Sequence, residues 1–234
     1  MKRIIFLVFR LLYRIPGWLM KIHYYNKHLE DTSFEERFDF TQKLIRKIDE
    51  KSRVRIHCYG KENLPQETGY LITPNHQGLF DALILFDTHD RPFKAVVKQE
   101  LMDVPVLKNV LSMIQFVAMD RSNLRASMKI IKTASKEISE GMNYVIFPEG
   151  TRIKEPGFGE AKAGLSMFAI KGKAMVVPIS IISNYKLFNR VTIYIDKPIS
   201  FEDYYRERLN TKDYERLSQN VLEVIKENYY INSK

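Results

Sequence analysis

The chain has a single cysteine, Cys58, among its 234 residues. One thiol excludes a disulfide within the chain and any metal site built from several cysteines, and it is typical of a reducing cytoplasmic setting. The five histidines never form the H-E-x-x-H pattern, and no G-x-S-x-G sequence marks a serine nucleophile. These absences argue against a multi-cysteine metal site, an H-E-x-x-H metal site and a serine nucleophile in a G-x-S-x-G turn.

Acidic residues and long apolar runs are both missing from the first 29 positions. The longest apolar run there, residues 4–9, is six residues long, whereas a membrane-spanning helix needs about 20. A signal peptide would also need a longer apolar stretch and a small-residue cleavage site. We expect residues 1–30 to form two short amphipathic helices, separated at Pro16-Gly17, that lie in the interface of an anionic membrane. The alternative is that they dock on the core of the domain.

The formal net charge is +9, and 45% of the residues are hydrophobic, enough for a large core. A basic chain favours an anionic partner, such as a phospholipid surface, a nucleic acid or a phosphorylated substrate. The basic residues are spread out, and no nucleic-acid-binding motif accompanies them. We therefore expect no nucleic-acid partner.

Apolar periodicity alternates between strand-like and helix-like segments along the rest of the chain. Strands are predicted at 53–59, 70–73, 93–97, 116–119, 144–147, 174–182 and 191–195. Helices are predicted at 33–51, 78–86, 104–114 (after Asp103 as a cap), 123–141, 164–170, 202–205 and 213–230. This alternation predicts one layered α/β domain over residues 31–234, with a largely parallel or mixed sheet flanked by helices.

The first of two informative motifs is Asn75-His76-Gln77-Gly78-Leu79-Phe80-Asp81, an H-x4-D pattern after a predicted strand. Residues five apart on a regular helix do not share a face, so His76 should lie in the turn and Asp81 in the first turn of the next helix. Asp81 would then accept the Nδ1–H of His76 and leave Nε2 free as a base. The alternative is a helix cap or a surface pair.

The second motif, Phe147-Pro148-Glu149-Gly150-Thr151-Arg152, also follows a predicted strand. Pro148 and Gly150 predict a tight turn. Arg152 offers a permanent charge with the fork geometry that suits phosphate, and Glu149 could orient Arg152 or a substrate hydroxyl. The alternative is a simple loop with an exposed ion pair. Both motifs stand at carboxyl ends of strands, where α/β sheets build their sites.

From about Val54 to Ile195 the chain resembles the glycerophosphate acyltransferase superfamily, most closely the bacterial 1-acylglycerol-3-phosphate acyltransferases. Four segments are similar to the four blocks of that family, in order: Asn75–Asp81, Asp120-Arg121, Phe147–Arg152 and Val176–Ile179. Two positions depart from the pattern, because Gly78 stands where the family usually has Ser and Gln115 where it usually has Gly. These departures leave donor and acceptor preference open.

The resemblance implies that His76 is the general base and that Asp81 orients it. The residues it implies for substrate binding are Lys98, Arg121, Glu149, Gly150, Thr151 and Arg152. It further implies that Val177 and Pro178 line the acyl site.

The implied reaction moves a fatty acyl group from an acyl thioester, either acyl-CoA or acyl carrier protein, to the hydroxyl of 1-acylglycerol-3-phosphate (lysophosphatidate), giving phosphatidic acid. No cofactor is implied. The implied place is the cytoplasmic face of the cell membrane, as a peripheral protein. Two alternatives remain: glycerol-3-phosphate or another lyso-lipid as the acceptor, and non-catalytic binding of anionic lipid.

Overall fold

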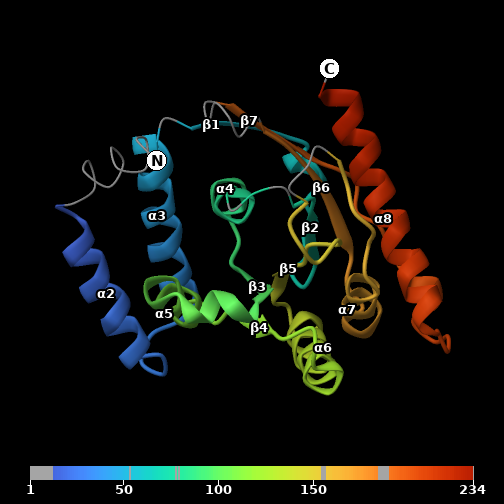
Figure 1. The fold of residues 1–234 in the computed structure, drawn as a ribbon, viewed down its shortest axis with the longest axis horizontal. Helices are drawn as coiled ribbons and strands as arrows, with labels where there is room; N and C mark the ends of the chain where they lie inside the picture. The colour runs from blue at the N-terminus through green and yellow to red at the C-terminus, as the bar shows by residue number, and fades with distance from the viewer. Residues whose placement is uncertain are drawn as a thin grey trace.

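The computed structural model describes residues 13–52, 54–76, 78, 80–153, 157–183 and 190–233 (Figure 1). Its helices are α2 (Ile15–Lys27), α3 (Phe34–Ser52), α4 (Phe80–Thr88), α5 (Pro105–Met113), α6 (Leu124–Ser139), α7 (Gly164–Gly172) and α8 (Thr211–Asn232). Short 3-10 turns occupy Lys61–Asn63, Gln99–Asp103 and Glu202–Tyr204. Its strands are β1 (Arg55–Tyr59), β2 (Leu71–Pro74), β3 (Phe93–Lys98), β4 (Val117–Met119), β5 (Asn143–Val145), β6 (Val176–Ser183) and β7 (Arg190–Ile195).

In the described part of the chain these strands form one seven-stranded sheet in the order β1-β7-β6-β2-β5-β3-β4. The five strands from β6 to β4 run parallel to one another. β7 pairs antiparallel to β6, and β1 pairs parallel to β7, so these two run the opposite way. The predicted α/β domain with a largely parallel, mixed sheet is therefore confirmed.

Helices cover both faces of the sheet and enclose two separate cores (Figure 1). One core joins the sheet to α2, α3, α4 and α5, and the other joins it to α6, α7 and α8. β2 lies between the two layers, and all four of its residues are buried. The parallel strands β2, β3, β4 and β5 all end on the same edge of the sheet, which brings the loops that follow them together.

Two helix starts differ in detail from the prediction. Asp103 was expected to cap the helix at 104–114, but it ends the 3-10 turn Gln99–Asp103, and Val104 is the cap residue. Pro105 occupies the first turn of α5, where its missing N–H leaves one donor fewer to satisfy. Pro16 and Gly17 likewise lie in the first turn of α2. The helix expected before them falls outside the described residues.

Helix α2 is attached to the domain along one side. Ile22 and Tyr25 are buried in the core shared with α3, α4 and α5. The Asn26 side-chain amide donates to the carbonyl of Asn109 on α5 at 2.8 Å. Exposed apolar groups also lie along α2: Tyr13 just before the helix, and Leu19, Met20 and Tyr24. Docking and an outward apolar surface therefore coexist, and none of the described helices is long and apolar enough to span a membrane.

Candidate active site

His76 and Asp81 meet in the loop that joins β2 to α4. The His76 Nδ1 lies 3.0 Å from Asp81 Oδ2. The same oxygen accepts the backbone N–H of Gly78 at 2.8 Å, and Asp81 is fully buried in the first turn of α4. A buried carboxylate at Nδ1 places the proton on that nitrogen and stabilises an imidazolium when one forms. This is the contact that the H-x4-D spacing predicts.

The His76 ring also packs on Phe147 of the second motif, with 4.0 Å between ring centroids. The His76 side chain is 18% exposed, so one part of the ring reaches solvent. Among the described residues, Nε2 makes no hydrogen bond. A partly exposed, oriented imidazole with no described partner at Nε2 has the form required of a general base.

Asn75 fixes the start of this loop to the neighbouring strand β6. Its side-chain amide donates to the carbonyl of Ile181 at 3.1 Å and accepts from the N–H of Ile181 at 2.7 Å. Asn75 is 1% exposed, so both bonds are shielded from water. The side chain thus continues the β2–β6 ladder past the end of β2. This role of Asn75 was not predicted from the sequence, although a short amide directly after a buried strand was the available signal.

Glu149 links the two motifs through backbone groups. One carboxylate oxygen accepts the N–H of His76 at 3.3 Å, and the other accepts the N–H of Gly159 at 2.8 Å. Glu149 is 3% exposed, and burial raises its pKa, although these two N–H groups oppose the shift. In the described residues it makes no ion pair with Arg152. The expected contact of Glu149 with substrate stays a prediction.

Arg121, from the loop after β4, lies over Gly150 of the second motif. A Cβ placed on Gly150 would stand 3.0 Å from Arg121 Nη1, so the guanidinium covers the bare backbone of the turn. Gly150 also has φ +67°, a conformation that favours glycine. Partial burial of the guanidinium lowers the pKa of Arg121, and Glu100 opposes this shift. Arg121 and the second motif therefore share one corner of the site.

The other predicted phosphate ligands lie at the same edge of the sheet, and both are exposed. Lys98 ends β3 beside Met119 of β4, and its Nζ lies 2.6 Å from Glu100 Oε1. Arg152 makes no ion pair with any described residue. Glu100 thus stands near two of the three expected cations, Lys98 and Arg121.

Val177 and Pro178 are buried inside the sheet, on β6 next to β2. Val177 belongs to the core on the α4 side. Their predicted part in lining the acyl site stays a prediction. In the described part of the chain, no three histidine, cysteine or acidic side chains gather as metal ligands would.

One departure from the expected family pattern has a visible consequence. Gln115, which stands where a glycine was expected, has φ +53°. A positive φ is uncommon for a residue with a Cβ. Gln115 therefore has a backbone conformation that glycine adopts more readily.

Comparison with known proteins points to one family. A family model described as Acyltransferase matches residues 55–182. The 1-acyl-sn-glycerol-3-phosphate acyltransferase of Borreliella burgdorferi is 28% identical over 141 residues, which cover 60% of this chain and 56% of that protein. The chloroplastic 1-acyl-sn-glycerol-3-phosphate acyltransferase LPAT1 of Arabidopsis thaliana is 29% identical over 171 residues, covering 68% of this chain and 48% of that protein. The chain spans about half the length of the curated relatives it matches.

A solved structure extends the likeness over the whole chain. The crystal structure of the 1-acyl-sn-glycerophosphate (LPA) acyltransferase PlsC from Thermotoga maritima aligns with a TM-score of 0.69, covering 99% of both chains. The two sequences are 21% identical over this alignment, so the likeness establishes a common fold.

Proposed function

The chain belongs to the acyltransferase family, and from this premise we propose that it moves a fatty acyl group from a thioester to the free hydroxyl of lysophosphatidate, forming phosphatidic acid. The observation that carries the proposal is the His76–Asp81 pair, 3.0 Å apart, at the same edge of the sheet as Lys98, Arg121 and Arg152. A base and a fixed set of positive charges match an acceptor that has one hydroxyl and one phosphate. The names of the relatives support this choice of acceptor.

In the proposed reaction Nε2 of His76 removes the proton from the acceptor hydroxyl as the oxygen attacks the thioester carbonyl. The C–O bond forms, and the carbonyl electrons move to oxygen in a tetrahedral intermediate. Collapse of the intermediate breaks the C–S bond and expels the thiolate, which takes the proton back from the imidazolium. The buried Asp81 carboxylate stabilises that imidazolium.

Binding of the acceptor phosphate is assigned to Arg121, Arg152 and Lys98. Arg152 is exposed and unpaired among the described residues, so its guanidinium is available to bind two phosphate oxygens. Lys98 pairs with Glu100, and a bound phosphate would compete with that carboxylate. Fixing the phosphate holds the hydroxyl against His76, which converts an encounter between molecules into a step within one complex.

We further propose that the chain binds the membrane peripherally through α2, on the cytoplasmic face. Leu19 and Met20 are 42% and 69% exposed on α2. Lys21 and Lys27 lie on the same helix and are exposed. Apolar groups beside basic ones suit the interface of an anionic bilayer, where the acceptor resides.

The test uses the purified full chain with lysophosphatidate in mixed micelles, and acyl-CoA or acyl carrier protein of the same chain length as donors. Mass spectrometry should find phosphatidic acid carrying the donor's acyl chain. Glycerol-3-phosphate and a lyso-lipid without a phosphomonoester serve as competing acceptors in parallel reactions. Failure to acylate lysophosphatidate, with turnover of either competitor, would contradict the proposed acceptor.

A further inference from the structure

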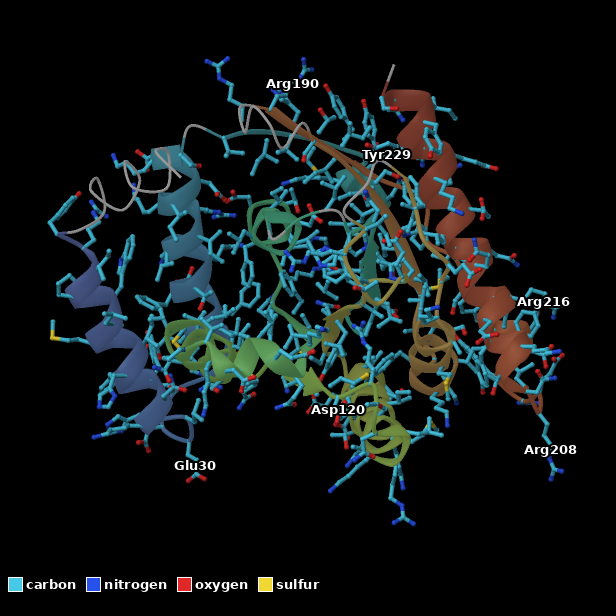
Figure 2. All side chains as sticks on the ribbon, viewed as in Figure 1. Glu30, Asp120, Arg190, Arg208, Arg216 and Tyr229 are labelled. Carbon is cyan, nitrogen blue, oxygen red and sulfur yellow. The ribbon has the colours of Figure 1, made fainter. Side chains whose placement is uncertain are left out.

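Four cations stand in line on the outward face of α6: Arg125, Lys129, Lys132 and Lys136. Their spacing of four, three and four residues places them on one narrow face of a helix with 3.6 residues per turn. The opposite face is buried in the core through Ile131, Ala134 and Ile138. We call these four residues the α6 basic stripe; in Figure 2, side chains with nitrogen ends extend from α6 away from the ribbon.

The charges of the α6 basic stripe are largely unpaired within the described residues. Lys136 has one partner, Glu140, at 3.6 Å. No described acidic residue forms an ion pair with the other three members of the stripe. Glu137, the remaining acid of the helix, turns the other way and pairs with Lys94 at 2.7 Å. Like charges one turn apart destabilise a helix slightly, so this row of cations does not stabilise the fold. Its positive charge is available to bind a partner.

The position of α6 relates the stripe to the proposed site. The helix is capped by Asn123, two residues after Arg121, whose guanidinium covers Gly150. Leu124, 76% exposed, and Met128, 36% exposed, flank the first turns of the stripe. A partner bound along the stripe would therefore meet apolar contacts at the end nearest the site, and charge over the rest of its length.

The stripe belongs to the layer opposite α2. The core beneath α6 is shared with α7 and α8, whereas α2 packs in the core on the other face of the sheet (Figure 1). α2, through which we propose that the membrane is bound, thus packs on the other face of the sheet from α6. The stripe is about 16 Å long at 1.5 Å per residue. This length suits contact with a helix on a partner protein better than contact with a single phosphate group.

Building on the proposed function, we propose that the α6 basic stripe docks an acidic acyl carrier protein, which delivers the acyl thioester to His76. Acidic side chains on one face of the carrier would pair with the stripe, and its apolar residues would contact Leu124 and Met128. Complementary charge of this kind mainly speeds encounter and selects the partner. The carrier holds its acyl chain on a flexible arm, so its body and its thioester can contact different parts of the protein.

The experiment compares two donors with one acyl chain, acyl-CoA and acyl carrier protein, using the full chain and lysophosphatidate in uncharged micelles. The test variant is Lys129→Glu/Lys132→Glu. The control variant, Arg208→Glu/Lys212→Glu, makes the same change in charge at exposed positions outside α6. Circular dichroism and thermal unfolding check that both variants fold.

The proposal predicts that the test variant raises KM for acyl carrier protein about tenfold or more and leaves KM for acyl-CoA within about twofold. The KM of the original chain for the carrier should rise with salt, and that of the test variant should rise less. Three results would overturn the proposal: an unchanged KM for the carrier, an equal rise for both donors, or an equal rise in the control variant. Vesicle binding lost in the test variant, with no change in donor preference, would assign the stripe to the membrane instead.

The same assay separates this inference from the proposed function. Turnover by the original chain with acyl-CoA but not with acyl carrier protein would overturn the docking proposal alone. Absence of turnover with both donors would overturn the proposed function itself, and the docking proposal with it.

Discussion

The Glu149 carboxylate accepts a hydrogen bond from the backbone N–H of His76, with 3.3 Å between the two atoms. Its second oxygen holds the N–H of Gly159. Glu149 is 3% exposed, so water could not readily replace it as the acceptor for either donor. The second motif therefore supports the loop that carries His76, in addition to any contact it makes with substrate.

Replacing Glu149 by Gln should disturb the His76 loop, because one end of the amide would present a donor to a backbone N–H. We expect a lower melting temperature and a loss of about 1–3 kcal/mol from the unmatched donor, with kcat reduced about tenfold or more. Glu160→Gln, at an exposed glutamate of the same loop, should change neither value. A Glu149→Gln protein with unaltered kcat and melting temperature would show that this carboxylate does not position His76.

Arg152→Ala should weaken binding of the phosphate-bearing acceptor and spare the thioester donor. Losing a charged hydrogen-bond partner should cost on the order of 1.5–3 kcal/mol, seen as a higher KM for lysophosphatidate. Arg152→Lys should restore binding only in part, because an ammonium cannot replace a bidentate fork. Separate KM measurements for the two substrates decide the matter, with Arg208→Ala as an exposed control. An effect confined to the donor would remove Arg152 from the phosphate site.

Leu19→Ser/Met20→Ser should reduce binding to anionic vesicles without unfolding the protein, since both side chains are exposed on α2. Each large apolar group that enters a bilayer fully contributes roughly 1.5–3 kcal/mol. Binding that remains should be more sensitive to salt, because the charges then dominate. Ile22→Ser is the contrasting control: Ile22 is 4% exposed, and its loss should lower the melting temperature. Unchanged co-sedimentation of the double variant would place the membrane contact elsewhere.

A buried aspartate in α3 should make stability depend on pH. Asp49 is 4% exposed, and burial, reinforced by nearby Asp87, raises its pKa to about 8. In the unfolded chain an aspartate ionises near its ordinary pKa of about 3.9. Between these two values the folded state binds more protons than the unfolded state, so the free energy of unfolding should fall as pH rises from about 4 to about 8.

Asp49→Asn should therefore flatten this fall and stabilise the protein at pH 8, by an amount on the order of 1–3 kcal/mol. Chemical unfolding at several pH values from 5 to 8 measures the effect. Asp39→Asn, at an exposed aspartate of the same helix, is the matched control. A variant that loses as much stability with rising pH as the original chain would exclude Asp49 as the source.

Much of the fold was predictable because the periodicity of apolar residues indicates which side of a helix or strand is buried. In the helix expected at 123–141, the spacing of Met128, Ile131, Ala134 and Ile138 indicates one inward face; the last three are buried, whereas Met128 is 36% exposed. The order of the strands was not predictable, since β1 pairs with β7 across 135 residues (Arg55 with Arg190) and nothing local specifies that partner. The reversed direction of these two strands follows from the same long-range pairing.

In the site, spacing predicted contacts between side chains but not contacts to the backbone. The H-x4-D pattern anticipated the contact between His76 and Asp81, because both partners are visible in the sequence. The partners of Glu149 are backbone N–H groups, and those of Asn75 are the backbone N–H and carbonyl of Ile181. Every residue has such backbone groups, so the sequence does not indicate which of them is the partner. Arg121 was placed in the site by resemblance alone, and its position over Gly150 depends on where β4 and β5 end.

Turnover of a purified His76→Ala protein, with lysophosphatidate and acyl-CoA, tests most directly whether His76 is the general base. We expect a loss of roughly 10²–10⁴-fold or more, with circular dichroism and melting temperature close to those of the original chain. Asp81→Asn, which leaves the loop a neutral partner, should also lose most activity. Near-full turnover by a folded His76→Ala protein would contradict the proposed mechanism.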